Sequence, residues 1–215
     1  MILKRIKIDV GLGEDTNCYI IQDSKSKEAI VIDPAGNVEE IIKMLNLLKA
    51  KLKYILITHC HGDHIGGVEE LRRKMGGKVL IHIIDAEGLY NEAISLTYYI
   101  GMPQIHLEAD SRLNDEDKIH IGDLEFQIIH TPGHTKGSIC LYCEKEKCLF
   151  SGDTLFRGTW GRTDLPTGSF EDIINSITNK LMLLPDDTIV YPGHGKSTII
   201  GEEKPIYLEL KPKIL

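Results

Sequence analysis

Histidine and aspartate side chains crowd a short stretch of the sequence at residues 59–64. His59, His61 and His64 lie there, and Asp63 directly precedes His64. Neutral imidazoles and carboxylates are the ligands that hold hydrolytic divalent metals in proteins. Burying three imidazoles and a carboxylate without partners would be costly. We therefore interpret this stretch as part of a metal site rather than as packed or surface histidines.

The spacing of these residues also predicts their backbone. Intervals of two and five residues do not share one face of a helix, so a loop leaving a strand is expected instead. Gly62 is expected to give the backbone the freedom to wrap around an ion. Cys60 should then point away from the site, because its neighbours on both sides face the metal.

Three further candidate ligands each follow another strand-like segment of the chain. They are His134, Asp153 and His194, and each stands next to a glycine. Because a rigid sheet positions the loops at its strand ends, we expect one shared site at one edge of the sheets. Seven candidate ligands exceed the four of a closed structural zinc site, and they suit two ions about 3.5–4 Å apart. The full set is His59, His61, Asp63, His64, His134, Asp153 and His194.

The other histidines do not belong to such a group. We assign them to packing or to the surface: His82, His106, His120 and His130.

The elements that must position the site alternate along the whole chain. Strands are predicted at 2–10, 17–23, 28–33, 53–58, 78–83, 124–130, 138–143, 147–153 and 187–193. Helices are predicted at 37–50, with Asn37 as N-cap, and at 68–75, 86–101 and 170–184. Two packed sheets with helices on their outer faces satisfy the burial needs of this pattern best, which makes the fold class α+β.

Composition limits the classes of function. The chain has 215 residues, 42% of them hydrophobic, and a net charge of −7. This charge excludes a nucleic-acid binder, and no apolar run has the length of a membrane span. The first residues lack the apolar core of a signal peptide, so a cytoplasmic protein with reduced cysteines is expected. We expect a small-molecule substrate and no membrane partner, and the sequence leaves the oligomeric state open.

Four motifs, in order, resemble the metallo-β-lactamase-fold hydrolases: THCHGDH at 58–64, TPGHT at 131–135, SGDTLF at 151–156 and YPGHG at 191–195. The resemblance implies an αββα four-layer sandwich with a dinuclear site at one edge of the two sheets. It implies one metal at His59, His61 and His134, a second at Asp63, His64 and His194, and Asp153 as the bridging carboxylate. The ions would be two divalent metals, zinc in the first place, with iron or manganese as alternatives.

Within this superfamily, FRGTWGRTDLPTG at 156–168 resembles the glyoxalase II branch. This resemblance implies hydrolysis of a thioester or ester by a metal-bound hydroxide that Asp63 orients. Only residues 195–215 follow His194, so we expect no C-terminal helical glutathione-binding domain. We therefore expect a single metallo-β-lactamase-like domain over residues 1–215, of the short glyoxalase II-like kind.

Several questions stay open at this point. The alternatives to a thioesterase are a mononuclear iron persulfide dioxygenase, a lactone or phosphodiester hydrolase and a non-catalytic metal-binding module. Arg157 and Arg162 are candidates for holding a substrate carboxylate, or else for pinning their loop to Asp164 or to the sheet. Residues 89–100 are candidates for covering the site, and Tyr99 and Trp160 are candidates for lining a pocket.

Overall fold

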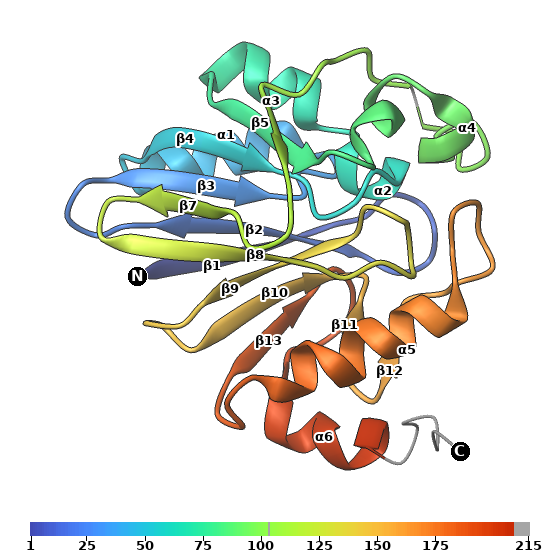
Figure 1. Cartoon of the computed structure of the whole chain (residues 1–215). Coiled ribbons are helices and arrows are strands. Elements are labelled where there is room, and N and C mark those ends of the chain that lie inside the picture. Colours follow the sequence, from blue (N-terminus) through green and yellow to red (C-terminus); the bar gives the residue numbers. More distant parts are fainter. Residues whose placement is uncertain (103, 209–215) are drawn as a thin grey trace.

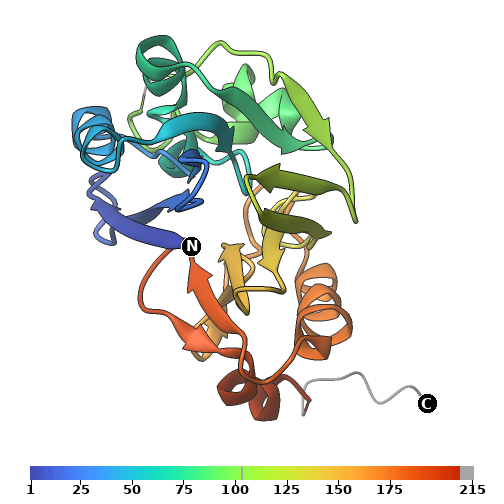
Figure 2. The same ribbon diagram turned by 90° about the vertical axis from the view of Figure 1, so that its left-hand side faces the viewer.

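Two six-stranded mixed sheets pack face to face in the computed structural model, which describes residues 1–102 and 104–208. Helices cover the outer face of each sheet, so the chain forms the predicted four-layer αββα sandwich (Figure 1). Figure 2, turned by 90°, shows the same layers from the side on which the N-terminus lies. Among the described residues, no helix combines the length and the apolar character needed to cross a bilayer.

The first sheet has the strand order β1-β2-β3-β4-β5-β6. Strands β1 to β3 pair antiparallel, and β3 to β6 pair parallel. Its strands are β1 (Ile2–Ile8), β2 (Thr16–Gln22), β3 (Glu28–Ile32), β4 (Lys51–Leu56), β5 (Lys78–His82) and β6 (Ser111–Leu113).

The second sheet has the order β14-β13-β10-β9-β8-β7, and only β10 and β13 pair parallel in it. A separate hairpin, β11 (Leu155–Phe156) with β12 (Thr159–Trp160), follows β10. The strands of the second sheet are β7 (Lys118–Ile121), β8 (Leu124–His130), β9 (Ile139–Cys143), β10 (Cys148–Gly152), β13 (Ile189–Pro192) and β14 (Thr198–Ile199).

The helices fall into two groups according to the sheet they cover. On the first sheet lie α1 (Val38–Leu47) and α3 (Val68–Met75), and on the second lie α5 (Phe170–Asn179) and α6 (Ile200–Leu208) (Figure 1). The short elements are α2 (Gly62–Ile65), α4 (Glu92–Ser95) and the 3₁₀ turns Ala86–Leu89 and Leu181–Leu183.

Three apolar clusters separate these layers. One lies between the two sheets around Phe126 and Phe150, and one lies beneath each helical layer. The sheets are buried on both faces, which explains why β2, β9 and β10 read as continuous buried runs rather than as an alternation. Cys140 and Cys143 belong to clusters on opposite faces of β9, as expected for residues three apart on a strand.

Two details of the predicted helices are wrong. Residues 86–101 do not form one helix, because Asn91 interrupts the segment by capping a new turn at Ala93 N and Leu96 adopts a left-handed conformation. Asn37 does precede α1, but its side chain bonds Glu40 instead of capping a backbone N–H. Its own backbone is left-handed, with a φ of 46°.

Candidate metal centre

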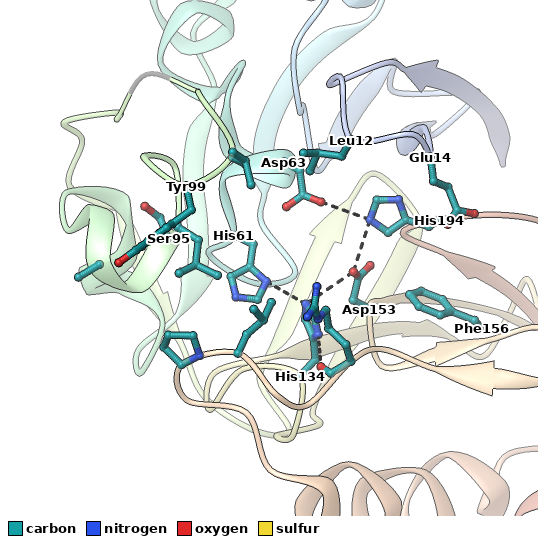
Figure 3. Close-up of a pocket in the computed structure, with 16 residues that line it drawn as sticks. Leu12, Glu14, His61, Asp63, Ser95, Tyr99, His134, Asp153, Phe156 and His194 are labelled. Atoms are coloured by element: carbon teal, nitrogen blue, oxygen red, sulfur yellow. Dashed lines mark hydrogen bonds and ion pairs between the residues drawn. The ribbon is translucent and has the colours of Figure 1, made fainter.

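Four strand ends meet at one edge of the two sheets and carry all the predicted ligands there. The strands are β4, β8, β10 and β13, as the sequence predicts. Figure 3 shows those ligands that border a cavity at this edge: His61, Asp63, His134, Asp153 and His194. The ligand atoms form three overlapping groups, and within each group they lie within 4.8 Å of one another. The groups are His59/His61/His134, His59/His64/Asp153 and Asp63/His64/His194.

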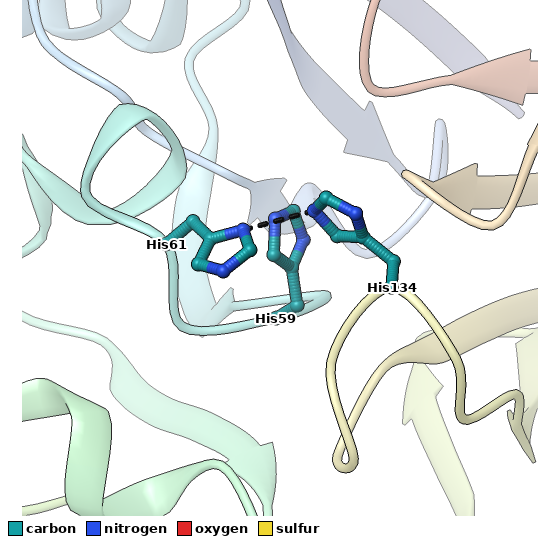
Figure 4. A group of neighbouring side chains, drawn as sticks. All are labelled: His59, His61 and His134. Atoms are coloured by element: carbon teal, nitrogen blue, oxygen red, sulfur yellow. Dashed lines mark hydrogen bonds between the residues drawn. The ribbon is translucent and has the colours of Figure 1, made fainter. Parts of the chain in front are cut away.

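The first group is a trio of buried imidazoles (Figure 4). His59 and His61 come from the end of β4, and His134 comes from the loop that joins β8 to β9. The ring centroids lie 4.6–4.9 Å apart in pairs, and His61 Nδ1 is 2.9 Å from His134 Nε2. Three rings at such distances, with nitrogens facing inward, match the geometry of a three-histidine metal site.

The group of Asp63, His64 and His194 lies beside this trio. His64 Nε2 is 3.2 Å from His194 Nε2, and His194 Nε2 is 3.4 Å from Asp63 Oδ2. Asp63 and His64 lie in the single turn of α2, so the predicted loop becomes helical after its first ligands. This turn places two successive residues on the same site.

The carboxylate of Asp153 lies between the two groups. Its Oδ2 is 3.6 Å from His134 Nε2 and 3.4 Å from His194 Nε2, while its Oδ1 is 3.4 Å from His64 Nε2. One carboxylate therefore faces histidines of both groups, which is the position of a ligand shared by two ions.

Hydrogen bonds on the outer side of the rings fix their orientation. His64 Nδ1 bonds Asp33 at 2.9 Å, His134 Nδ1 bonds the Arg162 carbonyl at 2.8 Å, and His194 Nδ1 bonds the Asp15 carbonyl at 3.0 Å. A ring that donates through Nδ1 presents the lone pair of Nε2, which is how a metal-binding histidine is held. The Nε2 atoms of these three rings therefore face the centre, where they are available as ligands.

Some atoms of the site lack partners within the protein. His59 Nε2 and Asp153 Oδ1 are buried without a hydrogen bond. The lone pairs of His64 Nε2 and His194 Nε2 face each other when both rings are neutral. Unpaired buried acceptors that converge on one point are costly, and a cation at that point removes the cost. The residues therefore fit divalent metal ions.

The pKa shifts indicate that the carboxylates of the site favour positive charge close to them. Burial alone would lower the pKa of His194, but Asp153 and Asp63 raise it to about 11. Burial would raise the pKa of Asp153, but His64 and His194 hold it well below its usual range. Burial lowers the pKa of His61 to about 3, which keeps that ring neutral and available as a ligand. The carboxylates thus supply negative charge, and His59 and His61, whose pKa values burial lowers, supply neutral nitrogens.

Asp33 is part of this arrangement although it does not face the metals. Its carboxylate accepts bonds from Thr58 N at 2.8 Å and Thr58 Oγ1 at 2.7 Å, besides the bond with His64. Asp33 follows β3 directly and has a left-handed backbone conformation with a φ of 50°. The sequence alone does not indicate that this carboxylate orients His64, because Asp33 stands outside the histidine-containing motifs.

Asp85 joins two of the site loops and was not predicted from the sequence. Its carboxylate accepts bonds from Cys60 N at 3.1 Å, Thr135 Oγ1 at 2.7 Å and Gly137 N at 2.7 Å. It therefore holds the 59–64 loop against the loop of His134. The position of Asp85 shortly after β5 is the sequence signal that could have indicated this role, because the ends of the parallel strands lie at the same edge of the sheet.

At two positions of the site, only glycine fits, because a side chain would collide with neighbouring atoms. A Cβ atom on Gly193 would lie 2.2 Å from Asp153 Oδ1 and 2.8 Å from His64 Cε1. A Cβ atom on Gly62 would lie 2.8 Å from Thr97 Cγ2. The expected reason for Gly62, backbone freedom, is wrong, because Gly62 begins α2 and its φ is not positive.

A cavity of about 660 Å³ opens in front of the ligands (Figure 3). Residues 93–100 contribute to its wall, Tyr99 among them, so the segment predicted to cover the site does border it. Arg162 lines the cavity, and its guanidinium forms a bidentate ion pair with Asp164. Neither Arg157 nor Trp160 is among the described lining residues, and Trp160 instead packs on Phe170 and Tyr207.

The remaining histidines lie away from the ligand groups, as predicted. His82 and His130 stack on each other with centroids 4.1 Å apart, and His120 pairs with Glu125 on the surface. Cys60 is fully buried in the cluster under the first helical layer, so it does point away from the site.

Comparison with known proteins agrees with this geometry. A hydroxyacylglutathione hydrolase, GloC, from Haemophilus influenzae is 38% identical over 190 residues, covering 87% of this chain and 89% of that protein. The crystal structure of the B3 metallo-beta-lactamase BLEG-1 matches with a TM-score of 0.89 and 37% identity, covering 98% of this chain and all of that one. The crystal structure of ETHE1 from Myxococcus xanthus matches with a TM-score of 0.79 and 30% identity, covering 95% of this chain and 82% of that one.

The family model of the metallo-beta-lactamase superfamily matches residues 11–194, a span that begins after β1 and ends on the last candidate ligand. Together with the four-layer fold and the converging histidines and aspartates, this match shows that the chain belongs to the metallo-beta-lactamase superfamily.

Proposed function

We propose that this protein is a hydrolase that cleaves a thioester, or an ester, with water activated at two divalent metal ions, zinc in the first place. Members of the superfamily are mostly hydrolytic enzymes that bind divalent metals. The observation that carries the proposal is the arrangement of seven side chains: two adjoining groups of three candidate ligands, with the carboxylate of Asp153 between them. A structural metal site needs only about four ligands, so this surplus favours catalysis over a purely structural role.

The chain's own residues would hold these ions in two places. His59, His61 and His134 would bind one, while the set of Asp63, His64 and His194 would bind the other. Bound divalent ions supply two effects, a water that ionises near neutral pH and polarisation of a carbonyl oxygen. Asp33 and the carbonyls behind His134 and His194 keep the ligand nitrogens aimed at the centre during turnover.

Asp63 has the position of the group that orients the attacking water. It borders the cavity, and its side chain is 17% exposed to solvent, so water can reach the carboxylate. Burial would raise its pKa, but His64 and His194 lower it, which leaves Asp63 a carboxylate that accepts a hydrogen bond from water. A thiolate is a good leaving group, so cleavage of a thioester does not require a protonated side chain on the departing sulfur.

No side-chain nucleophile is needed in this scheme. Cys60 lies within the ligand loop but faces the apolar core, and burial raises the pKa of its thiol well above the usual value. A buried, protonated thiol is a poor nucleophile. Direct attack by water is therefore the route that the described site supports.

The test is a panel of substrates on metal-loaded protein. We expect a thioester to be hydrolysed with release of free thiol, and dialysis against a strong chelator to reduce this rate at least 10³-fold. Added zinc should restore it. The panel includes S-lactoylglutathione, uncharged thioesters, a lactone, a phosphodiester and a β-lactam. Failure to cleave any thioester, or cleavage that resists complete metal removal, would contradict the proposal.

One alternative has an observation in its favour. The likeness to ETHE1, together with the three-histidine group and Asp153, also suits a single-iron oxygenase acting on a persulfide. Metal content and oxygen uptake separate the two functions. One iron per chain with oxygen consumption on a glutathione persulfide supports the oxygenase, whereas two ions with thiol release supports the hydrolase.

A further inference from the structure

The cavity in front of the candidate metal centre has two different sides. Its floor is formed by ligand side chains, with His61, Asp63 and Asp153 among them (Figure 3). Most of the remaining lining is apolar and comes from three separate segments of the chain. These are Leu12 before β2, the residues Ala93, Leu96 and Ile100 around α4, and Phe156 with Leu165 after β10.

The central part of this apolar wall is held in place. Asn91 caps the turn of α4, and Ser95 and Thr97 both bond the side chain of Gln104. Leu96 has a φ of 61°, a region that a leucine rarely adopts, and only 9% of its surface is exposed. Such strain persists only where surrounding contacts fix the residue, and it clusters at ligand sites. The wall is therefore preformed rather than built when a substrate arrives.

Beyond the ligand floor, the side chains that line the cavity offer little to an anionic group. Apart from histidines, Arg162 is the one cationic side chain among the described residues that line it. Its Nε and Nη2 each donate to an oxygen of Asp164 at 2.7 Å, so one edge of the guanidinium already holds a carboxylate and its charge is paired. Glu14 adds a carboxylate to the lining. The two carboxylates of a glutathione moiety would meet no unpaired cation in this lining.

We infer that the cavity selects thioesters whose acyl group is apolar and whose thiol is uncharged, rather than thioesters of glutathione. This inference rests on the proposed hydrolase function and names its substrate class. The apolar wall would bury a chain or ring of the acyl group while the carbonyl lies over the ligand floor. An anionic thiol would lose hydration there without gaining an ion pair from a side chain of the wall.

Four thioester substrates test the inference, because they can be compared in pairs that differ only in the acyl group or only in the thiol. They are the acetyl and hexanoyl thioesters of N-acetylcysteamine, which is uncharged, and of glutathione. Each methylene that is fully buried can raise binding of the transition state about fourfold. We expect kcat/KM to rise at least tenfold from acetyl to hexanoyl, and at least tenfold from glutathione to N-acetylcysteamine at equal acyl length.

A binding measurement gives a readout that does not depend on turnover. The thioethers S-hexyl-N-acetylcysteamine and S-hexylglutathione resist hydrolysis and can be titrated calorimetrically into the metal-loaded protein. The uncharged thioether should bind at least tenfold more tightly. Equal or tighter binding of the glutathione thioether would overturn the inference.

A charge placed in the wall should shift the preference. Leu12 is 49% exposed, so L12R adds a cation at the cavity without burying it. We expect L12R to raise kcat/KM for hexanoylglutathione severalfold and to lower it for the uncharged thioester. The matched control is L47R on α1, where Leu47 is 75% exposed and not among the described lining residues. It should leave both values unchanged.

The outcomes separate the inference from the function beneath it. Faster cleavage of glutathione thioesters, or no gain from acetyl to hexanoyl, overturns the substrate class and leaves the hydrolase intact. Cleavage of none of the four thioesters by the metal-loaded protein overturns both. An equal response of L12R and L47R also overturns the inference, since the added charge would then act only through the net charge of the protein.

Discussion

Replacing Asp63 by alanine should reduce thioester hydrolysis by about 10²–10⁴-fold, the range associated with loss of a positioned proton acceptor. The carboxylate borders the cavity and lies 3.4 Å from His194 Nε2. Its removal takes away the acceptor that orients the attacking water and a candidate ligand of the second ion. The three-histidine group does not include Asp63, so it should retain its ion. Steady-state kinetics and metal analysis on the same sample measure both effects.

Two variants control this experiment. D63N keeps the shape but loses the negative charge, and it should be nearly as inactive as D63A. D123A removes an exposed aspartate that pairs with Lys25 away from the site, and it should be fully active. Thermal melting should show that all three variants are folded. Near-normal activity of D63A would refute the proposed role of Asp63.

Replacing Asp153 by alanine should have the larger effect on metal binding. This carboxylate faces His134, His64 and His194 at 3.4–3.6 Å, and it is the only candidate ligand placed between the two groups in the described part of the chain. Without it, two cations would repel each other with no anion between them. We expect D153A to hold at most one ion per chain and to lose at least 10³-fold in activity.

A matched control for D153A is D110A. Asp110 is also an ordered carboxylate, bonding Val79 N and Arg72, but it lies outside the ligand groups. D110A should bind metal like the unchanged protein, with some loss of stability. Two ions per chain in D153A, measured by elemental analysis after gel filtration, would contradict a bridging position for Asp153.

The parts of the fold that the sequence predicted well are the buried strands. Runs such as 28–33 and 138–143 have an apolar interior between polar residues, so the sequence indicates both the type and the approximate bounds of these strands. The helix predicted at 68–75 matches α3 because an apolar stripe and charged residues alternate with helical period there. The four strand ends that carry ligands are recognisable for the same reason.

The segment at 86–101 shows where such a prediction fails. Its apolar residues fit a helical period, but Leu96 adopts a left-handed backbone and Asn91 bonds Ala93 N. Contacts with Gln104, which lies outside the segment, help to set this conformation. A local pattern cannot report a tertiary contact of this kind, so the wall of the cavity was not foreseeable in detail.

Asp33 and Asp85 illustrate the same limit within the site. Both are buried aspartates that follow strands, and neither stands in a histidine-rich motif. Their roles depend on partners that are 25 or more residues away in the chain, such as Thr58 for Asp33 and Gly137 for Asp85. The ligands could be predicted because their chemistry is visible in their type. Their supporting carboxylates could not, because an aspartate at a strand end is common.

The most direct test of the account is anomalous diffraction from crystals of the metal-loaded protein, recorded above and below the absorption edge of the metal. We predict two peaks about 3.5–4 Å apart. One should lie among His59, His61 and His134, the other among Asp63, His64 and His194, with Asp153 in contact with both. A single peak, or peaks away from these side chains, would contradict the claim that two ions are held by this one set of ligands.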